Sequence, residues 1–193
     1  MNYGELKKEL KALAFEEEST IEEYVETDII PTSINRAISM INNDVMPITK
    51  KYEIEQDGQD TQYLYYDMSE LTDDFLAFGK NPVRIDDGTV YKPFGDYEID
   101  DYSTLVISGA VKGKIAVYYR AEHEAYTAET PDTDEIPLPK RVHYLIPLLA
   151  AYFVWLDDDA TKAAQYYNAY ERESQAVIAE TNKPRIRILE GGI

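Results

Sequence analysis

The sequence has no cysteine and only two histidines among its 193 residues. Without cysteine the fold cannot depend on disulfides or a thiolate zinc site, and a cysteine nucleophile is excluded. No G-x-S-x-G sequence accompanies His123 or His143, and the phosphate-binding glycine motifs of nucleotide-dependent enzymes are missing. We therefore expect neither a cofactor nor an enzymatic activity. His143 is predicted to begin a helix and to face a partner or solvent.

Long apolar runs are also missing. The most apolar stretch, Tyr144–Leu156, has 13 residues and includes Pro147, whereas a membrane-spanning helix needs about 20. The charged N-terminus lacks the apolar stretch and cleavage site of a secretory signal. These features predict a protein that stays in the cytosol where it is made, without membrane contact.

Basic residues are scarce. The chain has 19 Lys and Arg against 37 Asp and Glu, a net charge of −18. Residues 53–135 alone contain 20 acidic and 6 basic residues, a net of −14. This charge argues against a surface that clamps nucleic-acid phosphates.

The acidic residues often stand in pairs, but the pairs suggest turns and helix caps rather than catalysis. Asp86 and Asp87 precede Gly88, as in a turn whose side chains bond their own backbone, and Asp157–Asp159 precede a helical pattern. The acidic stretches 96–101 and 132–135 are rich in the oxygen ligands that calcium prefers, but neither has the spacing of an EF-hand loop. Surface loops without metal are the preferred interpretation.

Helical periodicity is found at both ends of the chain. Leucines at 6, 10 and 13 predict an amphipathic helix over residues 4–15, and residues 16–18 are a charged stop. A second helix is predicted after Pro31, capped by Thr32 or Ser33 and ending near Met46. Near the other end, residues 140–157 predict a buried central helix kinked at Pro147, followed by a fourth helix capped by Asp158 or Asp159. The last two helices are expected to form an antiparallel hairpin.

Between these helical regions, short β-rich runs are separated by glycine- and proline-containing turns. They predict six or seven antiparallel strands, arranged as a one-sided sheet or a small sandwich. We therefore predict an α+β fold, a helical bundle formed by the N- and C-terminal helices with an inserted antiparallel β domain. The expected segments are N-terminal helices (1–50), the β domain (51–121), an acidic proline-containing linker (122–139), a helical hairpin (140–182) and an extended tail (183–193).

Seventeen tyrosines are the most unusual feature of the composition. Several fall on predicted strands, where aromatic rings stack bases only if a basic groove accompanies them. The acidity of this region favours protein–protein contact instead, because tyrosine buries a large area while its hydroxyl finds a partner. In the tail, Arg185 and Arg187 alternate with Ile186 and Ile188, a pattern suited to pairing with an exposed sheet edge on another subunit or on the portal. A frayed tail is the alternative.

The layout resembles the head-to-tail connector (adaptor, or head-completion) proteins of tailed bacteriophages. The resemblance rests on an entry at Leu138 and Pro139, a long Leu/Ala/aromatic helix, the Asp157–Asp159 cluster, and a helix carrying Ala164, Tyr167 and Tyr170. It covers most of the chain, except that the β insertion of roughly 70 residues is absent from smaller members.

The resemblance implies a virion assembly protein at the head–tail junction, made in the host cytoplasm. It implies a homo-oligomeric ring of twelve copies that binds the portal and tail or second-ring proteins, with DNA passing through the channel without specific binding. The predicted interface residues are Tyr167, Tyr170, Arg185, Ile186, Arg187 and Ile188. Two alternatives remain open, a sugar- or peptide-binding β module on a helical scaffold and a hydrolase that uses the acidic pairs.

Overall fold

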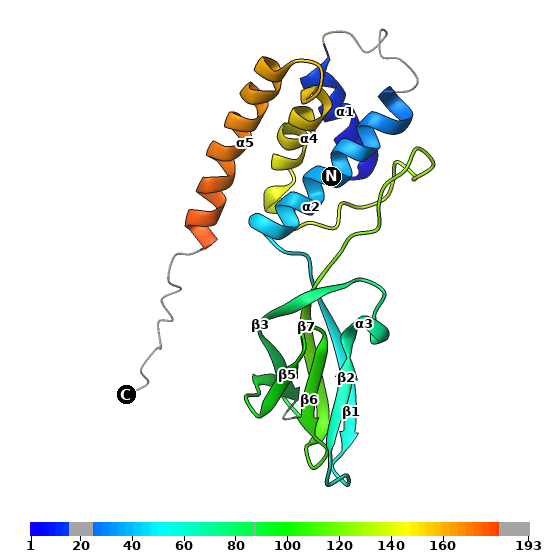
Figure 1. The fold of residues 1–193 in the computed structure, drawn as a ribbon, viewed down its shortest axis with the longest axis vertical. Helices are drawn as coiled ribbons and strands as arrows, with labels where there is room; N and C mark the ends of the chain where they lie inside the picture. Colours follow the sequence, from blue (N-terminus) through cyan, green and yellow to red (C-terminus); the bar gives the residue numbers. More distant parts are fainter. Residues whose placement is uncertain (16–24, 87, 182–193) are drawn as a thin grey trace. The chain divides into compact units, whose positions relative to one another are not determined.

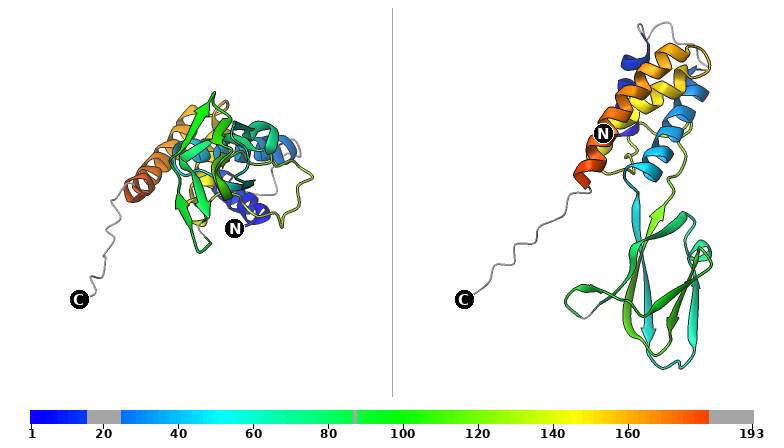
Figure 2. Two further views of the ribbon diagram at one scale, coloured as in Figure 1. Left: turned by 90° about the horizontal axis from the view of Figure 1, so that it is seen from below. Right: turned by 60° about the vertical axis from the view of Figure 1, so that its left-hand side comes forward.

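The computed structural model describes residues 1–15, 25–86 and 88–181, which form two compact units. The first unit takes its described residues from 1–46 and 125–181 and is helical, and the second, within 47–124, is built from antiparallel strands (Figures 1 and 2). The predicted α+β class, with helices from both chain ends and antiparallel sheets in between, is confirmed. The helical unit contains α1 (Tyr3–Ala14), α2 (Ile30–Asp44), α4 (Leu145–Trp155) and α5 (Ala160–Thr181).

Helix α1 begins with a reciprocal cap. The Asn2 side chain accepts a hydrogen bond from the Glu5 N–H at 2.8 Å, and the Glu5 carboxylate accepts one from the Asn2 N–H at 3.0 Å, so two otherwise unpaired amides are satisfied. Leu6 and Leu10 are fully buried as predicted, but Leu13 is 38% exposed. The buried stripe is completed by Tyr3 and Ala14.

Helix α2 differs from prediction at its start. It begins at Ile30, directly after a short π-helix over Val25–Ile29, and Pro31 occupies its first turn. The capping prediction for Thr32 and Ser33 is wrong, because both lie inside the helix and its N-terminus has no side-chain cap. Proline is accepted there because the first helical amides have no intrahelical acceptor.

Helix α4 is the centre of the helical unit. It packs against α1, α2 and α5 (Figure 1), and its buried residues lie on most of its circumference, which confirms the predicted buried central helix. The kink prediction is wrong, because residues 140–142 form a separate 3-10 turn and α4 begins only at Leu145. Pro147 therefore lies in the first turn, where no backbone hydrogen bond is lost.

His143 is also placed differently from the prediction. Its side chain is 7% exposed, and Nε2 lies 2.7 Å from the carbonyl oxygen of Leu138. The prediction that it faces a partner or solvent is wrong. The imidazole ties the start of the C-terminal helical region to the segment that precedes it.

Asp159 connects α4 to α5. Its carboxylate accepts hydrogen bonds from the N–H groups of Thr161 at 3.0 Å and Lys162 at 2.9 Å, which is the predicted N-cap. The two helices run in opposite directions and lie side by side (Figure 1), which confirms the expected hairpin. One face of α5 packs within the helical unit, where Ala163, Tyr170, Ser174 and Val177 are buried.

The segment before α4 has almost no regular structure but packs against the helices. The Asn35 side chain on α2 bonds both backbone groups of Tyr126, donating to its carbonyl oxygen at 2.8 Å and accepting from its N–H at 2.9 Å. The Tyr126 ring stacks on Tyr3, with centroids 4.3 Å apart. Ile136 and Leu138 are buried as well.

The β unit contains seven strands in the described residues, arranged in two antiparallel sheets with orders β1-β7-β3-β4 and β2-β6-β5. A short helix, α3, follows β2 and buries Met68 completely. The inner faces of the sheets are joined by a hydrogen bond between Gln56 of β1 and Tyr66 of β2, so the arrangement is the small sandwich. The bounds are β1 Thr49–Asp57, β2 Tyr63–Asp67, α3 Met68–Leu71, β3 Phe75–Asp86, β4 Tyr91–Pro93, β5 Tyr97–Asp100, β6 Thr104–Ser108 and β7 Lys112–Ala121.

Strand β3 is recognisable from the sequence only in its second half, where Val83–Asp86 form a β-rich run. The first half, Phe75–Gly79, pairs with β7 across shifts in register, and Asn81 has a φ of 57°. A strand interrupted by such a bulge loses the alternation that sequence analysis relies on. The predicted turn after β3 is confirmed for Asp86, whose carboxylate accepts the Gly88 N–H at 2.9 Å, and Asp87 lies outside the described residues.

Candidate interaction surfaces

Strand β2 presents two tyrosines to solvent. Tyr63 and Tyr65 are 66% and 65% exposed and lie on the same face of the three-stranded sheet, because they are two residues apart. Leu64 and Tyr66, between and after them, face the interior and are more covered. Two large aromatic side chains side by side in solvent are a feature of protein interaction surfaces.

Charge is divided between the two sheets. The strands of the three-stranded sheet carry three acidic residues, Asp67, Glu98 and Asp100, and no basic one. All eight basic residues of 47–124 lie on strands of the four-stranded sheet, where four acidic residues accompany them. The exposed tyrosines of β2 thus stand on the acidic sheet, where a nucleic acid would be repelled. This arrangement supports the interpretation of these tyrosines as a protein-contact surface.

The outer face of the four-stranded sheet is occupied by a polar cluster. Glu53 accepts hydrogen bonds from Lys51 at 2.6 Å and from the Tyr91 hydroxyl at 2.9 Å. These bonds lower the pKa of Glu53, and the bond to Glu53 raises the pKa of Tyr91. Nearby, the Arg84 guanidinium lies 4.9 Å from the Tyr118 ring centroid. Lys51 and Glu53 are thus paired with each other on this face.

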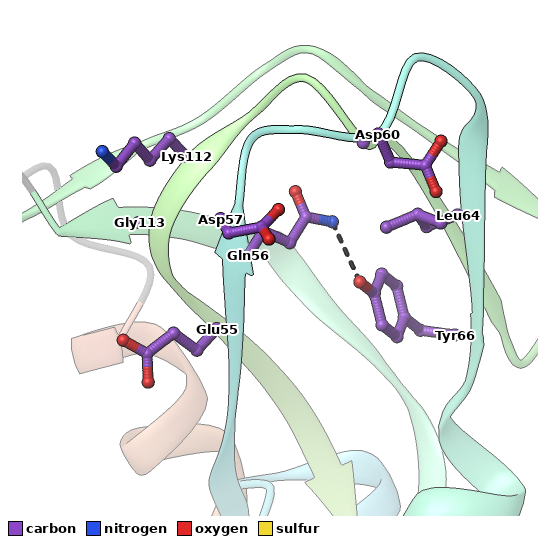
Figure 3. A pocket seen from close by; sticks show the side chains of 9 residues that line it. Glu55, Gln56, Asp57, Asp60, Leu64, Tyr66, Lys112 and Gly113 are labelled. Atoms are coloured by element: carbon purple, nitrogen blue, oxygen red, sulfur yellow. Dashed lines mark hydrogen bonds between the residues drawn. The ribbon is translucent and has the colours of Figure 1, made fainter.

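A cleft of about 580 Å³ opens at one end of the β unit. Its wall includes Gln56, Leu64 and Tyr66, and its rim carries carboxylates such as Asp60 together with Lys112 (Figure 3). The Gln56 amide and the Tyr66 hydroxyl lie 2.9 Å apart and bond each other. The Gln56 amide can also donate to the Val111 carbonyl when its oxygen accepts from Tyr66. The polar groups of the wall therefore form hydrogen bonds that connect the two sheets.

The predicted interface tyrosines of α5 lie against the other helices. Tyr170 is 4% exposed, and burial, followed by Asp44 and Tyr167, raises its pKa to about 12. Tyr167 is half-buried, and its ring centroid lies 5.0 Å from that of Tyr152 on α4. The Tyr166 hydroxyl donates to the Leu13 carbonyl at 2.7 Å. Within the chain these side chains hold α5 to α1 and α4, and little of Tyr170 is left for a partner.

The other predicted interface residues, Arg185, Ile186, Arg187 and Ile188, lie outside the described residues. Sequence reasoning missed two exposed side chains of the acidic sheet, Ile99 at 44% and Tyr102 at 74% exposure. Residues 97–100 alternate apolar and acidic side chains, and this alternation was the signal in the sequence that could have identified Ile99. Tyr102 follows Asp101, whose φ of 61° marks the turn between β5 and β6.

Residues 1–15, 25–86 and 88–181 contain no group of three or more histidine or acidic side chains arranged to hold a metal ion. Over the same residues, no helix combines the length and apolar character needed to cross a bilayer.

The two units define an α+β protein with exposed aromatic side chains on an acidic surface, as in proteins that contact other proteins. The chain belongs to the SU10 adaptor protein family, whose model matches residues 1–187. Comparison with curated proteins gave no match. Membership confirms the resemblance to phage head-to-tail adaptors seen in the sequence, and it implies a structural virion component that interacts with other virion proteins.

Proposed function

We propose that this adaptor forms a closed homo-oligomeric ring of about twelve copies between the portal and the tail, and that the ring lines the DNA channel without catalysing a reaction. The observation that carries the proposal is family membership over residues 1–187. The structure supports it with two large tyrosines held in solvent on an acidic sheet.

The charge of the chain suits a channel for DNA. A net charge of −18 gives a surface that repels phosphates at short range, within a Debye length of about 8 Å at physiological salt. DNA can then slide past without being held. We expect the protein to show no measurable affinity for duplex DNA at physiological salt.

The direct test is assembly. Purified protein is mixed with the portal protein of the same virus and measured by native mass spectrometry and electron microscopy. We expect a ring bound to the portal. A strictly monomeric chain without portal binding would count against the adaptor role.

The tyrosines of β2 are the first residues to change. Replacing both Tyr63 and Tyr65 with serine should weaken assembly by about tenfold or more, since buried tyrosines are frequent hot spots of interfaces. Tyr144→Ser is the matched control, because Tyr144 is also exposed, at 46%, but lies in the helical unit. Equal effects of the two changes would argue against a specific role for the β2 face.

The tail provides an independent test. Deleting residues 183–193 should leave the circular dichroism spectrum and unfolding midpoint unchanged and should weaken ring or portal attachment. Unchanged attachment would refute a role for the tail residues Arg185–Ile188.

A second candidate function is binding of a sugar or peptide by the β unit, which the cleft beside Tyr66 favours. This hypothesis predicts saturable binding of an oligosaccharide or peptide library to the full chain, lost in Tyr66→Ala. The adaptor proposal predicts no such binding.

A further inference from the structure

Strand β5 forms one edge of the acidic sheet. In the described residues it pairs only with β6, through Tyr97–Ile107, Glu98–Val106, Ile99–Leu105 and Asp100–Thr104. The backbone N–H and C=O groups on its other side point away from the sheet and can pair with a further strand. An edge of this kind is a template for β-strand addition.

The side chains of β5 alternate between two chemistries. Ile99 lies opposite the fully buried Leu105, so it belongs to the inner, apolar face, yet it is 44% exposed because no strand covers it on the outer side. Glu98 and Asp100 belong to the other face and are exposed. A strand that completes this edge therefore needs apolar residues at every second position and basic residues between them.

Residues 183–189 of the chain have this pattern. Ile186 and Ile188 alternate with Arg185 and Arg187, and the tail has three basic residues and one acidic one in a chain of the opposite sign. Pro184 disfavours continuation of a helix into these residues. In an extended conformation both isoleucines lie on one face and both arginines on the other.

We propose that the C-terminal segment of a second copy adds to the outer edge of β5 as a fourth strand. In this arrangement the isoleucines lie beside Ile99, and the arginines lie beside Glu98 and Asp100. The inference rests on the proposed multi-copy assembly and assigns one of its contacts. An extended segment passed from each copy to the next gives a head-to-tail interface, which is the kind that closes into a ring.

The other three edges fit the segment less well. On β2 the single carboxylate, Asp67, already accepts bonds from the N–H and hydroxyl of Ser69, at 3.0 and 2.7 Å. Strand β4 carries Lys92 and Pro93, and proline lacks the amide that a ladder needs. Strand β1 has alternating carboxylates at Glu53, Glu55 and Asp57, but Glu53 already accepts bonds from Lys51 and Tyr91, and the aliphatic Ile54 is only 6% exposed. Of the four strand edges in the described residues, β5 alone combines alternating carboxylates with a half-exposed aliphatic side chain.

The absence of natural cysteine allows a direct test by disulfide cross-linking. Full-length chains carrying Ile99→Cys are mixed with chains carrying one cysteine at 185, 186, 187 or 188. The mixtures are prepared under two conditions, at high concentration without portal protein and assembled with portal protein, and are then oxidised. We expect cross-linked heterodimers from Ile186→Cys or Ile188→Cys. Yields from Arg185→Cys and Arg187→Cys should be about tenfold lower, since cysteines on opposite faces of a sheet cannot be bridged. Val90→Cys replaces Ile99→Cys as the control at an exposed position in the same unit.

Charge reversal gives a second readout. Glu98→Arg with Asp100→Arg should weaken association at least tenfold, as should Arg185→Glu with Arg187→Glu. Mixing the two double variants should restore a complex, because each then supplies the partner that the other needs. A variant that fails to fold would not regain association on mixing, so rescue would show that these charges pair with each other.

The outcomes distinguish this inference from the proposed function. A ring that forms on the portal without the alternating cross-links would overturn the β5 pairing and leave the adaptor role intact. Cross-linking only within single chains carrying both cysteines would overturn exchange between copies. Absence of any assembly in the unmodified protein would instead refute the proposed function.

Discussion

The contact between Asn35 and the backbone of Tyr126 should make a measurable contribution to the stability of the helical unit. Asn35→Ala removes two hydrogen bonds, of 2.8 and 2.9 Å, across 91 residues of sequence. Each bond contributes about 1 kcal/mol net, and the partly buried backbone groups left behind add a penalty of similar size. The higher helix propensity of alanine offsets about 0.6 kcal/mol of this loss in folding free energy. The expected net loss is about 2 kcal/mol.

The single tryptophan provides the assay. Trp155 lies in the helical unit, where its indole N–H donates to the Ala14 carbonyl at 3.2 Å and its ring lies 5.8 Å from that of Phe15. Its fluorescence during urea unfolding should show a midpoint lowered by about 1 M. Ser39→Ala, at an exposed position on the same helix, should leave the midpoint unchanged or slightly raised. A shift below about 0.3 M for Asn35→Ala would refute the estimate.

Three further predictions concern other parts of the chain. Burial raises the pKa of Tyr3, Tyr126 and Tyr170 to about 12. Because the pKa in the unfolded chain is about 10, the stability linked to these groups is present below pH 10 and is lost as the pH rises towards 12. Unfolding measurements and absorbance titration of the phenolates should show this loss over the same pH range. Asp159→Ala should destabilise α5 by about 1 kcal/mol through loss of its cap, measured by urea unfolding, with the exposed Asp158→Ala as the control. Gly109→Ala should lower the thermal midpoint of the β unit, because a Cβ there would lie 2.8 Å from the Gln62 carbonyl oxygen; an unchanged midpoint would show that the backbone can yield.

Local chemistry explains which predictions from the sequence held. The cap at Asp159, the turn at Asp86 and the apolar helix α4 each depend on residues within a few positions of one another. Predictions failed where distant residues decide the outcome. The first half of β3, for example, is recognisable only from its pairing with β7.

The candidate surfaces were predictable in type but not in position. The tyrosine content indicated protein contact, yet Tyr170 turned out to be buried while Tyr63 and Tyr65 are the exposed pair. Burial of a ring depends on what packs over it, and spacing along one helix contains no information about the neighbouring helix. The separation of basic and acidic strands into two sheets could not be predicted either, because the order of strands in the two sheets differs from their order along the chain.

By itself the sequence determined the fold class, the acidic character of the chain and its likeness to phage adaptors, because periodicity, charge and motif order are properties of neighbouring residues. Only the tertiary structure decided which aromatic side chains remain in solvent and which edge of which sheet stays open. Those features arise when strands and helices far apart in the chain pack together, and each side chain is covered or left exposed by partners that its own segment does not specify.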